Sequence, residues 1–534
     1  MPKHCIPYQD TGYFSNLILD YLAQDPSVEF LYNRFPTLEN FGEQITEKAK
    51  FYPNENRKGL VEAINNQYKN LKISKATGTH LKNLEQHNTF TITTGHQLNL
   101  FTGPLYFLYK IVSSINLCKE LKKEYPENNF VPIYWMATED HDFDEINFFN
   151  FREKKMVWDR SSDGAVGEHS TEGLQKFYET FSKELGASPN AEKLKTLFKG
   201  AYLDHNNLAD ATRYLANELF GEYGLVTLDA NDTNLKQLFA PYIHEELFQK
   251  TSSESIEKTN EKINSIPGKN YKLQVNPREI NLFYLKIGLR ERIIEKEGEF
   301  YINNSKLKFS KSELESEIQN HPERFSPNVM LRPLYQEVVL PNLCYIGGGG
   351  ELAYWLQLKD YFKTQQVTFP ILLLRNSALL IPAKTVEKLS KLQVTVEDLF
   401  LKPHELKTKV TKQISDIRID FSQQRAHLKE QFKALYKLAQ QTDNSFKGAV
   451  AAQEKKQLNG LDNLEKRLLK AQKRKIADHL ERVSVLQNEL FPSGSLQERS
   501  HNFSEWYLGY GNELTPLLIK ELQPLDFRFL VLEV

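Results

Sequence analysis

Polar side chains gather directly after two apolar, strand-like runs in the first third of the chain. Residues 89–94 are β-branched or aromatic and are followed by Gly95-His96-Gln97, while residues 130–137 are apolar and are followed by Thr138-Glu139-Asp140-His141-Asp142. A carboxylate or an imidazole beside an amine can take up its proton or hold the charged group in place. The residue types therefore predict acid–base chemistry, and the candidate catalytic residues are Asp140, His141, Asp142 and His96.

The acidic cluster has two other interpretations. Its side chains could cap the next helix and pair with nearby arginine or lysine, or they could bind a metal, since His and Asp are frequent ligands. Successive residues at the end of a strand point in different directions, however, and no cysteine stands among them. We therefore expect no metal site here.

A third and a fourth polar cluster occupy the same kind of position later in the chain. Gly347-Gly348-Gly349-Gly350-Glu351 lies between an apolar run and a helical pattern, and Arg375-Asn376-Ser377 follows the apolar run 369–374. Uncovered N–H groups beside a helix N-terminus favour an anion, but the spacing matches neither the P-loop nor the dinucleotide fingerprint. We expect the glycines to cradle a carboxylate or phosphate, with tight packing as the alternative. We expect Arg375 and Asn376 to bind a carboxylate, with a buried ion pair as the alternative.

The loop after the first strand supplies further candidates. Gly103 starts a helix whose N-terminus would point at an anion, and Tyr106 and Lys110 lie one turn apart on that helix. Plain turn chemistry is the alternative for the loop, and a place on the helix surface is the alternative for the other two. The candidate substrate-binding residues are Gly95, Gln97, Thr102, Gly103, Tyr106, Lys110, Glu139, Gly347, Gly348, Gly349, Glu351, Arg375, Asn376 and Ser377.

These clusters need a scaffold that brings strand ends together, and residues 89–145 predict one. Between the two strands, Leu105, Leu108, Ile111 and Ile115 recur every three or four residues, which is typical of an amphipathic helix. Two strands joined by a right-handed helical crossover are parallel, and ligands bind outside the carboxyl ends of parallel strands. We predict an α/β fold with a parallel sheet and with the polar clusters side by side at one edge.

The composition divides the chain into three parts. Residues 1–384 form the predicted α/β core, with a small β-rich insertion near residues 270–310. Residues 385–492 are rich in Lys, Glu, Gln and Leu, and their apolar spacing predicts an antiparallel coiled-coil hairpin. Its second helix would be about 45 residues, or roughly 65 Å, long. Residues 493–534 return to an aromatic composition, and we expect them to pack back on the core. The strands expected in the insertion are 272–275, 282–287 and 300–302.

Bulk composition excludes several classes of protein. The 534 residues carry a formal net charge of -1, which gives no basic surplus for nucleic acid or an anionic membrane. The three cysteines are scattered, which argues against a disulfide framework and fits a reducing cytoplasm. The N-terminus lacks a signal-peptide pattern, and no apolar run approaches about twenty residues. We expect a cytoplasmic protein with no nucleic-acid or membrane partner.

Two long motifs make the chain resemble a known family. Residues 95–106 (GHQLNLFTGPLY) and 135–146 (WMATEDHDFDEI) are similar to its first two signatures, and shorter similarities cover residues 374–377, 494–499 and 524–527. The family is the bacillithiol biosynthesis cysteine-adding enzymes, and the resemblance spans nearly the whole chain. Position 96 is His where many members carry Gln.

The resemblance implies a Rossmann-like core, a coiled-coil hairpin and a homodimer. It implies that the chain joins cysteine to glucosaminyl-malate through an amide bond, the last step of bacillithiol biosynthesis. A carboxylate is a poor electrophile, so this reaction needs activation, for which we expect ATP and Mg²⁺, although the sequence has no firm cofactor motif. The malate part of the acceptor is dianionic and requires arginine, lysine or helix N-terminal N–H groups.

Two other functions fit parts of the sequence. A non-catalytic scaffold would bind a small ligand in the α/β core and use the coiled coil to assemble with a second copy or a partner. A nucleotidyltransferase acting on RNA would need a basic groove, which the net charge does not support. The four polar clusters at strand ends favour the enzyme.

Overall fold

The core of the protein is a five-stranded, fully parallel β-sheet. In the computed structural model, which describes residues 3–534, the strands lie in the order β13-β12-β2-β3-β6. Numbered along the chain, this is the 3-2-1-4-5 order of a Rossmann-like sheet, whose direction of winding changes between β2 and β12. The predicted fold class is therefore confirmed. The strands are β2 Thr89–His96, β3 Asn129–Met136, β6 Val226–Asp229, β12 Asn342–Gly347 and β13 Ile371–Leu374.

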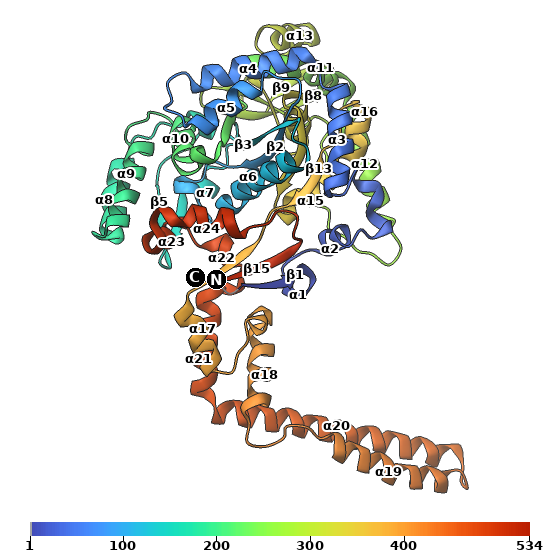
Figure 1. Ribbon diagram of the computed structural model, residues 1–534. Helices are drawn as coiled ribbons and strands as arrows, with labels where there is room; N and C mark the ends of the chain where they lie inside the picture. Colours follow the sequence, from blue (N-terminus) through green and yellow to red (C-terminus); the bar gives the residue numbers. More distant parts are fainter. Residues whose placement is uncertain (1–2) are drawn as a thin grey trace.

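Helices cover both faces of this sheet (Figure 1). In β13, Ile371 and Leu373 join an apolar cluster with α3 and α6, whereas Leu372 and Leu374 join the cluster on the opposite face. This period of two is what a strand buried on both sides requires. The helices on the first face are α3 Leu38–Phe51 and α6 Tyr106–Glu124, and those on the second include α4 Asn54–Tyr68, α11 Thr233–Gln249, α14 Arg332–Val339 and α15 Gly349–Leu356.

The segment between β3 and β6 begins with the short helix α7 (Phe143–Ile146) and a β-hairpin and continues as three helices. These elements share an aromatic-rich apolar cluster with α6. They are β4 Phe148–Phe151, β5 Lys154–Val157, α8 Leu174–Leu185, α9 Pro189–Tyr202 and α10 Leu208–Phe220. The remaining helices of the core are α1 Tyr8–Thr11, α2 Asn16–Leu22, α5 Lys75–Asn83, α12 Thr251–Asn264, α16 Lys359–Thr364, α22 Gln497–Ser500, α23 Phe503–Tyr510 and α24 Leu514–Glu521.

The β-rich insertion is a five-stranded antiparallel sheet that extends further along the chain than predicted. Its order is β10-β9-β8-β7-β11. The strand expected at 272–275 is wrong, because the backbone N–H groups of Gln274 and Val275 donate to the Gln357 side chain instead of to a neighbouring strand. The elements are β7 Leu282–Lys286, β8 Leu289–Lys296, β9 Glu299–Ile302, β10 Lys308–Phe309, α13 Lys311–Asn320 and β11 Phe325–Pro327.

A separate three-stranded sheet joins the two ends of the described chain. Strand β15 (Arg528–Glu533) pairs antiparallel with β1 (Lys3–Pro7) and parallel with β14 (Ala378–Ile381). Figure 1 shows both termini beside this sheet, where the core meets a helical arm. The C-terminal segment thus holds the base of the arm against the core.

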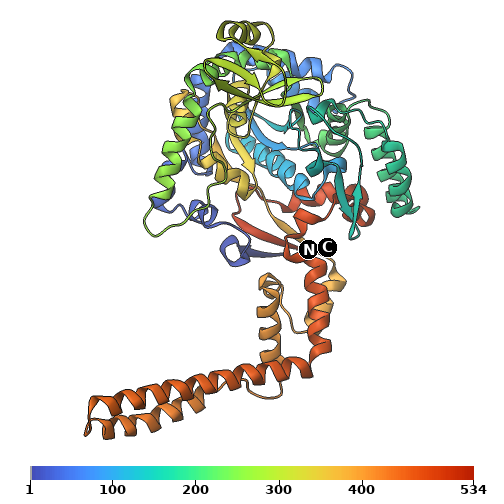
Figure 2. The ribbon, with the colours of Figure 1, turned by 180° about the vertical axis from the view of Figure 1, so that it is seen from behind.

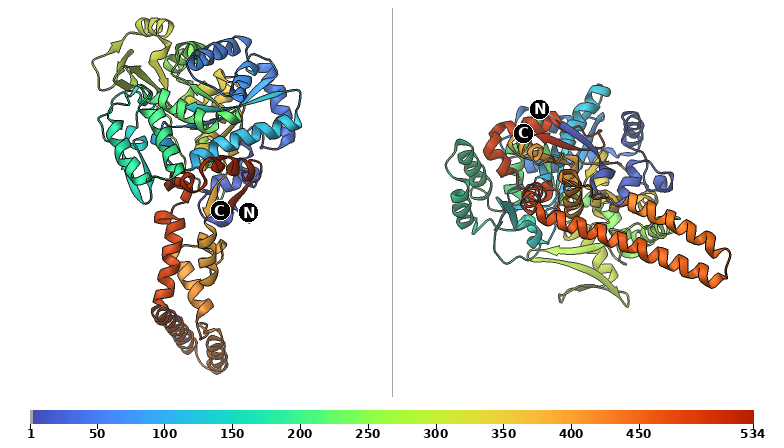
Figure 3. Two further views of the ribbon diagram at one scale, coloured as in Figure 1. Left: turned by 60° about the vertical axis from the view of Figure 1, so that its left-hand side comes forward. Right: turned by 90° about the horizontal axis from the view of Figure 1, so that it is seen from below.

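The arm differs from the predicted hairpin in length and shape. Only α19 and α20 form the antiparallel pair, and the long second helix is interrupted at Ile476 (φ −110°, ψ 26°). The interruption lets α18 pack against both α20 and α21. Helices α18 and α21 form a stalk next to the core. Figures 2 and 3 show the hairpin of α19 and α20 extending sideways from the far end of this stalk, away from the core. The arm helices are α17 Ala383–Lys391, α18 Pro403–Ile414, α19 Ser422–Ala439, α20 Asn444–Lys475 and α21 Ala477–Leu490. Within residues 3–534, none of the helices combines the length and the apolar character that crossing a membrane requires.

Candidate active site

A cavity of about 650 Å³ lies at the carboxyl edge of the parallel sheet. The ends of β2, β3 and β12 open into it, so it stands where the winding of the sheet reverses, the usual ligand position in this architecture. Most of the candidate residues from the sequence meet here. Those that line the cavity are Gly95, His96, Gln97, Tyr106, Lys110, Glu139, Asp140, His141, Asp142, Gly348, Glu351 and Arg375.

The other candidates lie behind the cavity wall. Thr102 and Gly103 form a tight turn with φ of 68° and 61°, and the Gly103 carbonyl accepts a hydrogen bond from Asn502. Asn376 is held by Ser113 and by the Gln523 carbonyl, and it positions the backbone rather than a ligand. The predicted substrate-binding residues that do not line the cavity are Thr102, Gly103, Gly347, Gly349, Asn376 and Ser377.

The loop after β2 starts later than the sequence indicated. Gly95 and His96 are the last residues of β2, paired with Trp135 and Met136 of β3, and are not part of a turn. The sharp change of chain direction falls at Phe101 and the two residues after it, all with positive φ. His96 is consequently buried inside the sheet edge, and its ring packs on Tyr106 and Phe107.

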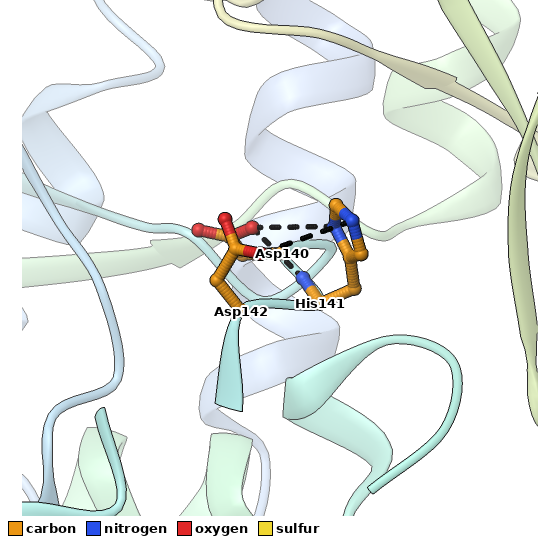
Figure 4. A group of neighbouring side chains, drawn as sticks. All are labelled: Asp140, His141 and Asp142. Carbon is orange, nitrogen blue, oxygen red and sulfur yellow. Dashed lines mark hydrogen bonds and ion pairs between the residues drawn. The ribbon is translucent and has the colours of Figure 1, made fainter. Parts of the chain in front are cut away.

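The acidic loop after β3 brings its three side chains together (Figure 4). The Asp140 carboxylate accepts hydrogen bonds from the His141 backbone N–H at 2.8 Å and from Gln97 Nε2 at 3.0 Å. His141 Nε2 lies 3.9 Å from Asp142 Oδ1, and ligand atoms of all three residues lie within 4.8 Å of one another. The expectation that neighbouring residues here face apart is therefore wrong, because the chain has left the extended conformation of the strand.

Arg290 of the insertion sheet covers this loop. Its Nη1 donates to His141 Nδ1 at 2.6 Å, and its guanidinium lies 4.1 Å from the centre of the Phe283 ring. Because arginine can only donate, Nδ1 must accept, and the neutral imidazole carries its proton on Nε2. A positive guanidinium at this place also disfavours a metal ion on the same imidazole.

The charge state of Asp140 follows from these contacts. Burial alone would raise the pKa of Asp140, but hydrogen bonds from His141 and Gln97 and the charge of Arg290 outweigh it and hold the pKa well below its usual range. Asp140 is thus a permanent negative charge at neutral pH. It can hold a cation, but it is a weak proton acceptor.

Glu139 fixes the loop from behind. Its carboxylate pairs with Lys236 of α11, which is buried and also donates to the Phe325 carbonyl at 2.6 Å. Thr138 donates to Asp229 at the end of β6. The loop is therefore tied to the sheet, to α11 and to the insertion.

The glycine run holds a carboxylate of the chain itself. The Gly348 N–H donates to Glu351 Oε2 at 2.8 Å, and the same oxygen pairs with Lys110 Nζ at 2.6 Å. Burial would raise the pKa of Glu351, but Lys110, Gly348 and the Tyr345 hydroxyl bring it to about 2. The Gly348 N–H that was expected to cradle a ligand anion is thus already occupied.

Arg375 shows the buried ion pair that was the alternative interpretation. Its Nη2 lies 2.7 Å from Glu498 Oε1, and both side chains are almost fully buried. Glu498 also accepts hydrogen bonds from the Ser377 hydroxyl and the Ala378 N–H. The pair joins the end of β13 to α22 at the base of the arm.

Four arginines to which the sequence analysis assigned no role also line the cavity. Arg278 and Arg290 come from the insertion and Arg332 from α14, which local patterns do not connect to the strand ends. Arg499 belongs to the closing motif 494–499, so the resemblance was a signal that could have found it. Across residues 3–534, none of these four forms an ion pair with a carboxylate, although the charge of Arg290 acts on Asp140, Glu139 and Asp142. The other three add positive charge to the cavity.

Comparison with known proteins covers the whole chain. The family model described as "Bacillithiol biosynthesis BshC, N-terminal Rossmann-like domain" matches residues 1–376, and the model described as "Bacillithiol biosynthesis BshC, C-terminal coiled-coil domain" matches residues 378–534. A protein of Christiangramia forsetii is 57% identical over 536 residues, covering 100% of this chain and 99% of its own. Relatives from Flavobacterium johnsoniae (57% identity, 100% of both chains) and Cytophaga hutchinsonii (39%, 98% of this chain and 97% of the relative) are similar over comparable lengths. All three bear the name "Putative cysteine ligase BshC".

Proposed function

This chain belongs to the bacillithiol biosynthesis BshC family, and we propose that it is a ligase that joins L-cysteine to glucosaminyl-malate through an amide bond, the last step of bacillithiol biosynthesis. The observation that carries the proposal is the mixed charge of one cavity. Arg278, Arg332 and Arg499, which form no ion pair within residues 3–534, line the same cavity as Asp140 and Asp142 at the ends of the parallel strands. Such a cavity fits a ligand that is anionic at one end and an amine at the other.

The arginines suit the malate end of the acceptor. Guanidinium groups bind carboxylates through paired, charge-assisted hydrogen bonds. Arg332 is held by the Tyr354 hydroxyl and by Gln336, both at 3.1 Å, so its fork is oriented before a ligand arrives. We assign the malate carboxylates to this side of the cavity.

The acidic loop suits the amine. Asp140 stays ionised and would hold the ammonium form of the sugar amine, which must lose a proton before it attacks. While Arg290 donates to His141 Nδ1, that imidazole has no free lone pair and acts as a hydrogen-bond donor. Asp142, an exposed carboxylate beside His141 Nε2, is then the group we propose to accept the proton and pass it to water.

The cysteine carboxylate needs an activating group, and we propose ATP with Mg²⁺ as the co-substrate. The glycine run does not fit its phosphates, because the Gly348 N–H is bonded to Glu351. The carboxylates of the acidic loop are oxygen ligands of the kind that Mg²⁺ prefers, but Arg290 competes for the same loop.

A mass-spectrometric assay of the purified protein tests the proposal. With cysteine, glucosaminyl-malate and ATP-Mg, we expect an amide-linked thiol together with AMP or ADP. Cysteine amide in place of cysteine is the control, since it has no carboxylate to activate and should give no product. A folded protein that binds the acceptor and yields no amide under these conditions contradicts the ligase and favours the non-catalytic scaffold.

We also propose that the protein acts in the cytoplasm as a homodimer assembled through its arm. The arm supports this, because Leu435, Leu438, Phe446 and Leu464 on α19 and α20 expose 40–52% of their surface. A second copy that covered these side chains would remove their apolar surface from water.

A further inference from the structure

One buried asparagine joins the two segments of the chain that carry Arg278 and Arg332. Asn281, which directly precedes β7, is 1% exposed. Its side-chain oxygen Oδ1 accepts the Arg278 backbone N–H at 3.2 Å and Asn328 Nδ2 at 2.9 Å. Because a single oxygen binds both groups, the backbone at Arg278 and the side chain of Asn328 are held next to each other.

The backbone of each arginine is fixed by these contacts. The carbonyl of Arg278 accepts a second hydrogen bond from Asn281, through Nδ2 at 2.8 Å. Asn328 Oδ1 accepts two backbone N–H groups of the following turn, at 2.9 and 3.2 Å, and the Asn328 carbonyl accepts the Arg332 N–H at 2.8 Å. Asn328 thus caps α14, whose first residue is Arg332.

The Asn281 amide is itself held in one orientation. Its Nδ2 also donates to Ser252 Oγ at 2.8 Å, so both donors and both lone pairs of the side chain are used. The Asn281 backbone N–H donates to Glu246 Oε1 at 2.8 Å, and the Ser252 hydroxyl donates to the same oxygen. Since Glu246 lies on α11 and Ser252 on α12, the amide is anchored to two helices of the core.

A second buried amide anchors the other end of the segment that carries Arg278. Gln357, at the end of α15, is 1% exposed. Its Oε1 accepts the backbone N–H groups of Gln274 and Val275, and its Nε2 donates to the Val275 carbonyl at 2.9 Å. Residues 274–281 therefore form a strap that is fixed at both ends and lines the cavity with Val275 and Arg278.

The charges of both arginines are available to a ligand. Arg278 and Arg332 line the cavity and form no ion pair within residues 3–534. The charge of Glu351 acts on Arg332, but that carboxylate is paired with Lys110. Each guanidinium can bind a carboxylate through paired, charge-assisted hydrogen bonds. Two of them on backbones held at a fixed separation favour a ligand that carries two carboxylates.

We propose that Asn281 is a positioning residue that sets the separation of Arg278 and Arg332, and thereby the preference for an acceptor with two carboxylates over one with a single carboxylate. The inference rests on the proposed function, since it takes the malate end of the acceptor as the group that both arginines bind. Asn281 does not line the cavity and acts through the two arginines.

Binding of two acceptors that differ by one carboxylate tests the proposal without turnover. The probes are glucosaminyl-malate and glucosaminyl-lactate, which have the same sugar and amine, and Kd is measured by ligand-observed NMR on the full-length protein. We expect wild type to bind the malate compound about tenfold more tightly or better, the usual effect of one charged hydrogen bond. Equal Kd values for the two compounds in wild type would overturn the proposal.

Replacing Asn281 should remove this preference. Asn281→Ser cannot hold both segments at once, so we expect the malate compound to bind about tenfold more weakly while the Kd of the lactate compound, which needs one arginine only, changes little. A malate preference that survives in a folded Asn281→Ser variant contradicts the positioning role.

Asn116→Ser is the matched control for a loosened fold. Asn116 is also buried, and its Nδ2 donates to the carbonyls of Ile519 and Leu522 at 2.8 and 2.7 Å, but it does not line the cavity. We expect urea unfolding to show a loss of stability in both variants and NMR to show a lost preference only in Asn281→Ser. An equal loss of preference in Asn116→Ser would count against the proposal.

Asn328→Ser keeps the test decisive if Asn281→Ser does not fold. Serine retains a cap for α14 but has no amide to donate to Asn281, so it cuts the link on the Arg332 side. We expect Asn328→Ser to reduce the malate preference and to have no further effect in Arg332→Gln, because both changes act on one contact. Additive losses in the double variant would show that the link does not act through Arg332.

Amide formation is measured separately from binding. A malate preference that depends on Asn281 but comes without amide product removes the ligase alone. Amide product without such a preference removes the positioning role alone.

Discussion

At the scale of single residues, Arg290 determines what the acidic loop can do. It blocks one nitrogen of His141 and adds positive charge beside Asp140. In the proposed function the loop would hold a substrate amine through Asp140, and the imidazole of His141 would serve as a donor. The sequence motif shows the same residues but not this division of roles.

Replacing Arg290 tests its contribution to binding. Arg290→Gln removes the charged hydrogen bond to His141 Nδ1 that holds the acidic loop, so we expect the KM for glucosaminyl-malate to rise about tenfold or more while the KM for cysteine changes little, since a charged hydrogen bond is worth about 1.5–3 kcal/mol. Steady-state kinetics of the ligase assay measure both constants. Lys296→Gln, an exposed change at the far end of the same strand, is the control. An unchanged KM for the acceptor in Arg290→Gln would contradict the assignment.

Glu351 gives a pH-dependent prediction at the same scale. Its pKa of about 2 lies below the 4.5 of an unfolded chain, so its ionisation stabilises the folded state above pH 4.5, and this stability is lost as pH falls toward 2. We expect the melting temperature of wild type to exceed that of Glu351→Gln at pH 6 and the gap to narrow steadily between pH 4.5 and 3. Differential scanning calorimetry measures the gap, and a constant difference over this range would show that the Lys110 pair is not its source.

At the scale of elements, the loop after β3 depends on a helix and a strand far away in the chain. Lys236 of α11 reaches both Glu139 in the loop and the carbonyl of Phe325 in β11. Since Lys236 is buried, this one side chain sets the distance between the sheet edge and the insertion that carries Arg290.

Removing Lys236 alone should lower the free energy of unfolding more than removing the charges of both Lys236 and Glu139. Lys236→Met leaves the Glu139 carboxylate buried without a counter-charge, and we expect it to destabilise the protein by about 3–5 kcal/mol. The double variant Lys236→Met/Glu139→Gln should recover much of that loss, because no isolated charge remains. Urea unfolding of both variants decides this, and a single variant as stable as the double variant would refute the uncompensated charge.

At the scale of the whole molecule, the arm and the cavity are physically joined. α22 follows the stalk helix α21, pairs with Arg375 through Glu498, and places Arg499 at the cavity. The arm, which we propose forms the dimer, is therefore separated from the cavity by the short helix α22 alone.

The exposed leucines of the arm make the dimer testable. Leu438→Glu together with Leu464→Glu places charges on the apolar surface of the hairpin, so we expect the mass in solution to fall from dimer to monomer. Light scattering after size-exclusion chromatography measures the mass, and Lys437→Glu, at an exposed polar position, is the control. A double variant that remains dimeric would place the interface elsewhere.

The sequence by itself determined the features that depend on neighbouring residues. β-branched, aromatic and apolar runs marked β2 and β3, the helical period marked α6, and the charged, leucine-rich composition marked a coiled-coil hairpin. Polar residues at strand ends could be grouped because a parallel sheet puts those ends on one edge. The break at Ile476 was missed, since the sequence carries no proline or glycine there and the packing of α18 on both α20 and α21 is a long-range contact.

Only the tertiary structure decided which of these residues face the cavity and what they contact there. Four arginines of the cavity lie roughly 130 to 360 residues beyond the acidic loop in the sequence, and only long-range packing brings them to it. They are Arg278, Arg290, Arg332 and Arg499. The same packing filled the glycine run with Glu351 and turned Arg375 into an ion pair that leaves one nitrogen free. Burial and distance set the charge and the hydrogen-bonding role of a side chain, and neither is a property of the local sequence.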